Sequence, residues 1–329
     1  MARSILLAAA SLMWPAVLVA QTAAGPPLVL ETKIPLGQVS GRIDHLGIDV
    51  KRQRLFVAEL GNNSLGVVDL AAGKVLRTIS GLREPQGVAY VPFADSVFVA
   101  NAGDGSVHVL RGDDLAPIGR IELGEDADNV RVDTQRNRVL VGYGNGALAV
   151  IDPATRTKVS DIRLKGHPEG FQIDETGTQV FANVPDARDV EMADLASEAN
   201  RSLPTHGLGS NFPMAIDRDV HRVLVVFRNP PTLMALSSQD GGIVAKIETC
   251  GDADDVFVDH KRRRVYVSCG EGVVDVVEQG EAGYRRLTRV PTVSGARTSL
   301  FVPELDKLFV AVRARSKEPA AIWVFRPLP

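Results

Sequence analysis

The sequence predicts an all-β chain folded as a closed seven-bladed β-propeller. Three observations support this prediction: a motif that recurs seven times at a nearly constant interval, room for four strands in every repeat, and a spare strand near the N-terminus. Thirty glycines and nineteen prolines among the 329 residues fit a fold with many turns.

The recurring motif is a pair of short apolar strands joined by a tight polar turn, as in GIDVKRQRLFVA (47–58) and VFVDHKRRRVYVS (256–268). We define the anchor of a repeat as the residue six before the first apolar residue of its second strand. The anchors, spaced by 41–43 residues, are Asp49, Val91, Asp133, Asp174, Asp217, Asp259 and Val302. So regular a period indicates one repeat array, and therefore a single domain over residues 25–329.

Two further strands follow in each repeat, as in SLGVVDL (64–70) and KVLRTIS (74–80). Four antiparallel strands in about 40 residues are typical of one propeller blade. A single four-stranded unit buries little apolar surface, whereas a ring buries each blade against its neighbours.

The last repeat stops after its third strand, AAIWVFRP (320–327). The segment PLVLETKIPLG (27–37) resembles the fourth strand of the other repeats. We expect this N-terminal strand to pair into the last blade and close the ring. An open solenoid is the alternative, but capping repeats are missing and the spare strand is present.

The first twenty residues have the layout of a secretory signal peptide. A basic residue, Arg3, precedes an apolar stretch from Ile5 to Ala20, and small residues follow. Cleavage is expected after Ala20 or as late as Ala24. An uncleaved anchor is the alternative, which Pro15 and the short apolar run disfavour. This pattern predicts a periplasmic or secreted protein.

The charge balance excludes some partners. A formal net charge of −3 and a pI near 6.1 argue against wholesale nucleic-acid binding. No later segment is apolar enough over sufficient length to span a membrane. We expect a monomer whose partner is a small molecule or another protein.

The strand patterns RLFVAELGNNSLGVVDL (54–70), SVFVANAGDGSVHVL (96–110) and RVYVSCGEGVVDVV (264–277) resemble those of the YVTN/YncE-like repeat family. The resemblance covers essentially the whole chain after the signal peptide. It implies an exported seven-bladed propeller that serves as a binding or interaction scaffold, without a shared set of catalytic residues. The family motif is structural, so it does not specify an activity.

The loops that lead into the first strands, here called leading loops, are expected to meet at one mouth of the central channel. The residue five before the anchor differs from repeat to repeat, and neighbouring loop positions supply further polar side chains. The predicted binding residues are Arg42, Asp44, His45, Gln86, Asp128, Asn129, Glu169, Asp254 and Arg297. His167, and His206 with less support, are expected at the same mouth. The composition predicts an acidic mouth that binds a ligand or partner.

Four carboxylates from different repeats could hold Ca²⁺ or another divalent metal: Asp44, Asp128, Glu169 and Asp254. With His45 and His167 a transition metal such as Zn²⁺ becomes an option. The alternative is that these acids cap turns in the leading loops.

An enzymatic alternative uses the same mouth for metal-dependent hydrolysis of a lactone or ester, or for a lyase reaction. His45 or His167 would be the base and Arg297 would hold an anion. No established catalytic motif is present, so the scaffold interpretation is preferred.

The turns between first and second strands are basic, as in VKRQR (50–54) and HKRRR (260–264). They predict a basic opposite face, either a merely solvated surface or a site for polyanions. Cys250 stands just before one leading loop and Cys269 ends the second strand of the same repeat, so they are expected to form a disulfide, which fits an exported chain; two free thiols at a metal site are the alternative.

Overall fold

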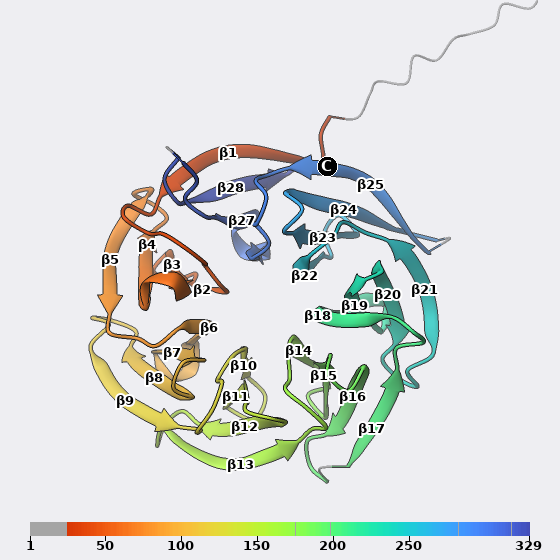
Figure 1. The fold of residues 1–329 in the computed structure, drawn as a ribbon, viewed down its shortest axis with the longest axis horizontal. Helices are drawn as coiled ribbons and strands as arrows, with labels where there is room; N and C mark the ends of the chain where they lie inside the picture. The colour runs from red at the N-terminus through yellow and green to blue at the C-terminus, as the bar shows by residue number, and fades with distance from the viewer. Residues whose placement is uncertain (1–24, 175, 198, 282, 317) are drawn as a thin grey trace, which may run out of the picture.

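The computed structural model describes residues 25–174, 176–197, 199–281, 283–316 and 318–329, and over these ranges the predicted fold is confirmed. Seven four-stranded antiparallel sheets are arranged as blades around a central channel (Figure 1). The predicted signal peptide, with both cleavage positions, lies outside the described residues. Within the described ranges, no helix is long and apolar enough to cross a membrane.

The first four blades follow the chain in order. Blade 1 comprises β2 (Leu46–Asp49), β3 (Arg54–Glu59), β4 (Ser64–Asp69) and β5 (Lys74–Ser80). Blade 2 comprises β6 (Pro85–Val91), β7 (Ser96–Asn101), β8 (Ser106–Arg111) and β9 (Pro117–Glu122). Blade 3 comprises β10 (Val130–Asp133), β11 (Arg138–Tyr143), β12 (Ala147–Asp152) and β13 (Thr157–Arg163). Blade 4 comprises β14 (Phe171–Ile173), β15 (Gln179–Val184), β16 (Asp189–Asp194) and β17 (Asn200–Pro204).

The remaining blades complete the circle. Blade 5 comprises β18 (Gly209–Asp217), β19 (Arg222–Asn229), β20 (Pro231–Ser237) and β21 (Ile243–Glu248). Blade 6 comprises β22 (Ala253–Asp259), β23 (Arg264–Cys269), β24 (Val273–Gly280) and β25 (Gly283–Pro291). Blade 7 comprises β26 (Ser299–Val302), β27 (Lys307–Val312), β28 (Ala321–Pro327) and β1 (Leu28–Pro35). Short 3₁₀ turns cover Leu60–Asn62, Pro92–Ala94, Arg218–Val220 and Pro303–Leu305.

The N-terminal strand closes the ring, as the sequence predicts. β1 pairs antiparallel with β28, with Leu28 opposite Pro327 and Pro35 opposite Ala321 (Figure 1). Leu36 N also donates to Ala320 O at 2.8 Å. Residues from the two ends of the chain therefore form one sheet, and its packing against blade 1 covers the apolar faces that the end blades of an open array would expose.

The core lies between blades, and this explains why the second strands are apolar on both faces. In β3, Leu55 and Val57 pack with Ile322 of blade 7, whereas Phe56 packs with Val97 of blade 2. Each blade is thus enclosed by two neighbours, while the outermost strands, such as β5, are largely exposed.

The turns that join first to second strands share one backbone conformation. The residue four after the anchor is left-handed in several blades, with φ of 51° at Gln53, 53° at Asn137 and 53° at Arg263. The aspartate anchors accept bonds from turn amides, for example Asp49 Oδ1 from Arg52 N at 3.0 Å. We call the side of the ring that carries these turns the turn face; the leading loops open on the other side.

Candidate functional site at one mouth of the channel

Glycines let neighbouring leading loops approach one another closely. A Cβ atom on Gly87 would lie 2.1 Å from Asp128 O, and one on Gly170 would lie 2.4 Å from Phe212 O. Gly170 N donates to that same Phe212 carbonyl at 2.9 Å. Blades 2 and 4 therefore contact the following blade backbone to backbone, which fixes Asp128 and Phe212 at the mouth.

All seven residues that stand five before the anchors line a single cavity of about 330 Å³ at the mouth: Asp44, Gln86, Asp128, Glu169, Phe212, Asp254 and Arg297. Arg42, His45 and His167 line it as well. Asn129 lines a second cavity of about 410 Å³ just below, in the channel. His45, Glu169, Phe212 and Asp254 line both cavities, so the two are continuous. The predicted residues are thus brought together, although His206 is exposed and lines neither cavity.

Three further residues line the mouth that were not among the predicted site residues: Asp126, Phe212 and Arg228. Asp126 and Phe212 occupy the loop positions seven and five before their anchors. Arg228 stands eleven residues after its anchor, at the end of the second strand. Arg313 of blade 7 occupies the equivalent position. The repeat register applied to the ends of the second strands would therefore have indicated Arg228.

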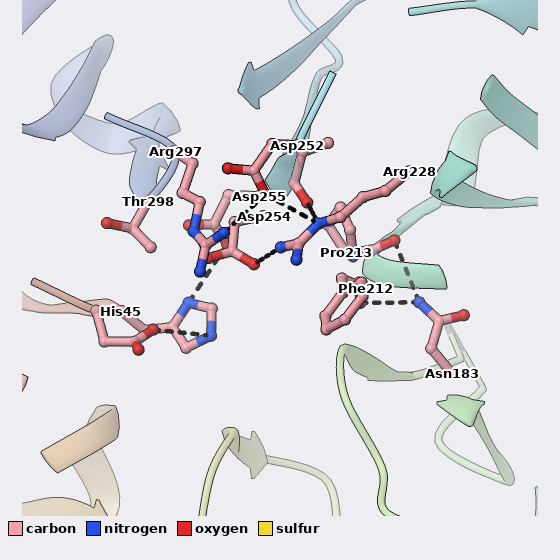
Figure 2. Close-up of polar contacts among 12 residues, drawn as sticks. His45, Asn183, Phe212, Pro213, Arg228, Asp252, Asp254, Asp255, Arg297 and Thr298 are labelled. Carbon is pink, nitrogen blue, oxygen red and sulfur yellow. Dashed lines mark hydrogen bonds and ion pairs between the residues drawn. The ribbon is translucent and has the colours of Figure 1, made fainter. Parts of the chain in front are cut away.

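An arginine–aspartate cluster occupies the blade 5–6–7 side of the mouth (Figure 2). Arg297 Nη1 lies 2.7 Å from Asp252 Oδ1, and its Nε lies 2.9 Å from Asp254 Oδ2. Arg228 pairs with Asp254 as well, and its Nε donates to Ala253 O at 2.7 Å. Asp254 is thus held between two guanidinium groups. Burial nevertheless raises the pKa of Asp254 to about 6, against the opposing effect of Arg297 and Arg228.

The aromatic ring of Phe212 packs against this cluster. The guanidinium carbon of Arg228 lies 3.7 Å from the centroid of the Phe212 ring, a cation–π contact (Figure 2). Asn183 Nδ2 donates to the carbonyls of Phe212 at 2.9 Å and Pro213 at 3.2 Å. The ring and its loop are therefore fixed by blade 4.

His45 lies among carboxylates. Its Nδ1 is 3.5 Å from Asp255 Oδ1, and its Nε2 is 3.7 Å from Asp44 Oδ1. Burial by itself lowers the pKa of His45, but Asp255, Asp44 and Asp128 outweigh it and raise that pKa to about 10. Arg42 Nη2 lies 2.7 Å from Asp44 Oδ2. At neutral pH His45 is an imidazolium inside an ionic network.

The blade 3–4 side of the mouth has fewer ion pairs. His167 Nδ1 lies 2.7 Å from Gly144 O, and its Nε2 lies 4.0 Å from Asp128 Oδ2. Burial opposes protonation of His167, but Asp128, Gly144 O and Asp126 raise its pKa to about 9. Burial, reinforced by Asp128, raises the pKa of Glu169 to about 8, so this carboxyl is largely protonated at neutral pH.

Two buried acceptors on this side lack a hydrogen-bond donor. In the described part of the chain Asp128 Oδ1 and Asn129 Oδ1 have no hydrogen-bond partner, and the two residues are only 4% and 2% exposed. An unsatisfied buried polar group costs on the order of 1–3 kcal/mol. These atoms therefore provide sites for a donor that enters the channel.

The mouth is rich in acids, as the sequence predicts, but most of them are paired with basic groups. Among the described residues, five acids, three arginines and two histidines line the upper cavity. Two further acids, Asp252 and Asp255, pair with Arg297 and His45 beside this cavity, so acidic and basic groups are close to balance. The sequence-based expectation counted leading-loop acids but not the arginine that the second strand of blade 5 contributes.

The four predicted metal ligands are not gathered into one compact cluster. Over the described residues, Asp44, Asp128, Glu169 and Asp254 form no group whose ligand atoms lie within 4.8 Å of one another. The carboxylates of Asp44 and Asp254 instead form ion pairs with arginines. These two carboxylates serve in ion pairs, and a Ca²⁺ site, which takes six to eight oxygens, stays a prediction.

Cys250 and Cys269 form a disulfide, with their Cα atoms 5.9 Å apart. It joins the start of a leading loop to the end of β23, and both sulfurs are buried beside Val267. The bond ties down the loop that carries Asp252 and Asp254.

On the turn face, several arginines are used within the fold. Arg52 Nη1 lies 2.8 Å from Asp49 Oδ2 and 2.8 Å from Asp95 Oδ1 of blade 2. Arg262 likewise joins Asp259, at 3.0 Å, to Asp306 of blade 7, at 2.6 Å. These arginines link adjacent blades, so the basic sequence of the turns overstates the charge left for a polyanion.

Comparison with solved structures shows the fold. The chain is similar to a chain in the crystal structure of the mitotic checkpoint complex, with a TM-score of 0.80 and 12% identity, covering 100% of this chain and 99% of that one. It is also similar to the RRP9 WD40 repeats (TM-score 0.77, 11% identity, 93% and 98% covered). Hydrazine synthase of Kuenenia stuttgartiensis matches with a TM-score of 0.71 and 17% identity, covering 88% of this chain and 98% of that one.

No family model matches the sequence. No curated protein matches it either. At identities of 11–17%, the structural likeness establishes a seven-bladed propeller with WD40-like neighbours and does not extend to their activities.

Proposed function

We propose that this protein is an exported binding module that holds a small polar ligand at the mouth formed by the leading loops. The ligand carries amine or hydroxyl donors, which meet the free acceptors on Asp128 and Asn129. Those two buried, unpartnered oxygens are the observation that carries the proposal. On the opposite side, Arg297 and Arg228 can receive an anionic or acceptor group of the same ligand.

The divergence of the repeat supports a recognition role for this mouth. The position five before the anchor is acid, amide, aromatic or guanidinium in different blades, while the surrounding strands keep the repeat. A structural role common to all blades would favour one residue type there. Loops on a rigid scaffold are where proteins place binding residues.

Export to the periplasm or the medium is part of the proposal. It is supported by the signal-peptide pattern of residues 1–20 and by the Cys250–Cys269 disulfide, since such bonds persist in oxidising compartments. The resemblance to YVTN/YncE-like repeats points the same way.

The proposal is tested by thermal-shift measurements with diamines, amino acids and monosaccharides, each at millimolar concentration. We expect at least one class to raise the melting temperature of the wild type, and Asp128→Asn to abolish that rise. Asp152→Asn, the same change in the same blade but on the turn face, is the matched control and should leave the rise intact. The absence of a shift with every class, or an equal shift in Asp128→Asn, would show that only water meets these oxygens.

A further inference from the structure

Asp217, the anchor of blade 5, lacks the partner that other aspartate anchors have. Asp49, Asp133 and Asp259 each pair with an arginine three residues later, at 2.8, 3.4 and 3.0 Å. In blade 5 the residue at that position is Val220. Asp217 is 0% exposed, and over the described residues neither of its carboxylate oxygens has a well-aligned hydrogen-bond donor.

Blade 4 shows that a missing arginine can be compensated by other groups. The residue three after Asp174 is Gly177, and Asp174 instead accepts bonds from Thr176 Oγ1 and from Gln179 N at 2.8 Å. Blade 5 offers less among the described residues: no well-aligned donor meets Asp217 Oδ1 or Oδ2, and of the backbone amides only that of Asp219 interacts with the carboxylate. A buried carboxylate in this state is costly unless a cation joins it.

Two metal-ligating side chains lie beside Asp217: Asp219 in the same turn of blade 5, and His260 across the gap between blades 5 and 6. His260 Nδ1 lies 3.8 Å from Asp217 Oδ1 and 3.0 Å from Asp219 Oδ2. One ligand atom from each of the three residues lies within 4.8 Å of the others, and no other such trio occurs in the described part of the chain. Two ligands on a tetrahedral zinc ion, each about 2.0–2.1 Å from the metal, would be about 3.3 Å apart.

We propose that Asp217, Asp219 and His260 bind one divalent transition-metal ion of the Zn²⁺ type on the turn face, between blades 5 and 6. An imidazole with two carboxylates suits zinc and its neighbours in the first transition row better than Ca²⁺ or Mg²⁺, which prefer oxygen ligands alone. Asp219 and His260 are 66% and 40% exposed, so an ion can reach the site from solvent. The ion would take the place that arginine occupies in blades 1 and 6, joining adjacent blades.

The primary test is calorimetric titration of the untagged, chelator-treated protein with ZnCl₂, MnCl₂ and CaCl₂. We expect one equivalent of Zn²⁺ to bind more tightly than Ca²⁺. His260→Asn should weaken zinc binding at least about tenfold, since even loss of an outer-shell partner costs about 10–100-fold. His206→Asn, which removes an exposed histidine elsewhere, should change nothing. Failure to detect saturable zinc binding, or equal binding in His260→Asn, overturns the proposal.

Two variants of the anchor pair separate metal binding from folding. Asp217→Asn removes the buried charge without changing shape, so the metal-free protein should melt at the same or a higher temperature, and zinc should no longer raise that temperature. Val220→Arg supplies the guanidinium that blades 1, 3 and 6 have, and should likewise block zinc while preserving the fold. A zinc-dependent rise of wild-type size in either variant would contradict the assignment.

Discussion

The two ends of the channel are built from the same repeat but use it differently. On the turn face, blades 1 and 6 repeat one arrangement, in which the anchor aspartate pairs with an arginine that reaches the next blade. At the mouth, the residue five before the anchor differs in type from blade to blade. The ion pair between anchor and arginine recurs because it stabilises the same contact between adjacent blades. The loop position at the mouth has no such common structural role, so its side chain can differ from blade to blade. The departure at Asp217 stands out because it occurs on the face where the repeat is otherwise kept.

The largest effect is expected from breaking a contact between blades on the turn face. Arg262→Ala leaves Asp259, whose side chain is 1% exposed, without its cation, and should destabilise the protein by about 3–5 kcal/mol. Denaturant unfolding measures the loss. Arg263→Asn, a change to the exposed neighbour that keeps a residue tolerant of left-handed φ, is the control. If both variants lose the same stability, the contact between blades has no special role.

At the mouth, a change in backbone spacing should have the next largest effect. Gly170→Ala would place a methyl group against Phe212 O, and should cost about 1–3 kcal/mol while displacing the Phe212 loop. Gly251→Ala, whose new Cβ would have no neighbour nearer than 3.8 Å, should be close to neutral. Thermal unfolding of the two variants compares them. An unaffected Gly170→Ala would mean that the loops can separate without cost.

The protonation of Glu169 at the mouth should make the free energy of unfolding depend on pH. Burial raises its folded pKa from 4.5 to about 8, so between these values the folded state binds the extra proton. This contribution to stability is complete below pH 4.5 and is lost as the pH rises through 8, by at most about 1.4 kcal/mol per pH unit. Glu169→Gln should flatten that slope between pH 5 and 8 and be the more stable protein above pH 8. Unfolding curves at pH 6, 7 and 8 measure it, and equal slopes for the two proteins would refute a raised pKa.

The smallest effect is expected from an exposed charge on the turn face. Lys261 lies 3.1 Å from Asp306 but is 70% exposed, so Lys261→Ala should cost less than about 1 kcal/mol. Its comparison with Arg262→Ala in the same turn separates charge from burial, by the same denaturant measurement. A loss as large as that of Arg262→Ala would show that the number of charges matters more than their burial.

The repeat register predicted much of the candidate site because it fixes where the backbone goes. Positions counted from the anchors predict that Asp44, Gln86 and Glu169 meet at one mouth of the channel, and all three line one cavity there. Arg228 was missed because the register was applied only to the leading loops and not to the ends of the second strands. Arg228 matters to the charge of the mouth because it pairs with Asp254, one of the acids that the sequence analysis counted.

The sequence by itself determined the seven blades, their closure by residues 27–37 and the set of loops that meet at the mouth. The reason is that the order of apolar and turn residues along the chain sets the spacing of the strands. Only the tertiary structure decided which charges pair. Arg52 and Arg262 find their second partners in the next blade, about one repeat away in the sequence. Asp217 meets His260 across a blade boundary, and in the described part of the chain it forms no ion pair with an arginine like those of Asp49 and Asp259. Such pairings depend on distances of a few ångströms between side chains, which the spacing of residues along the chain does not set.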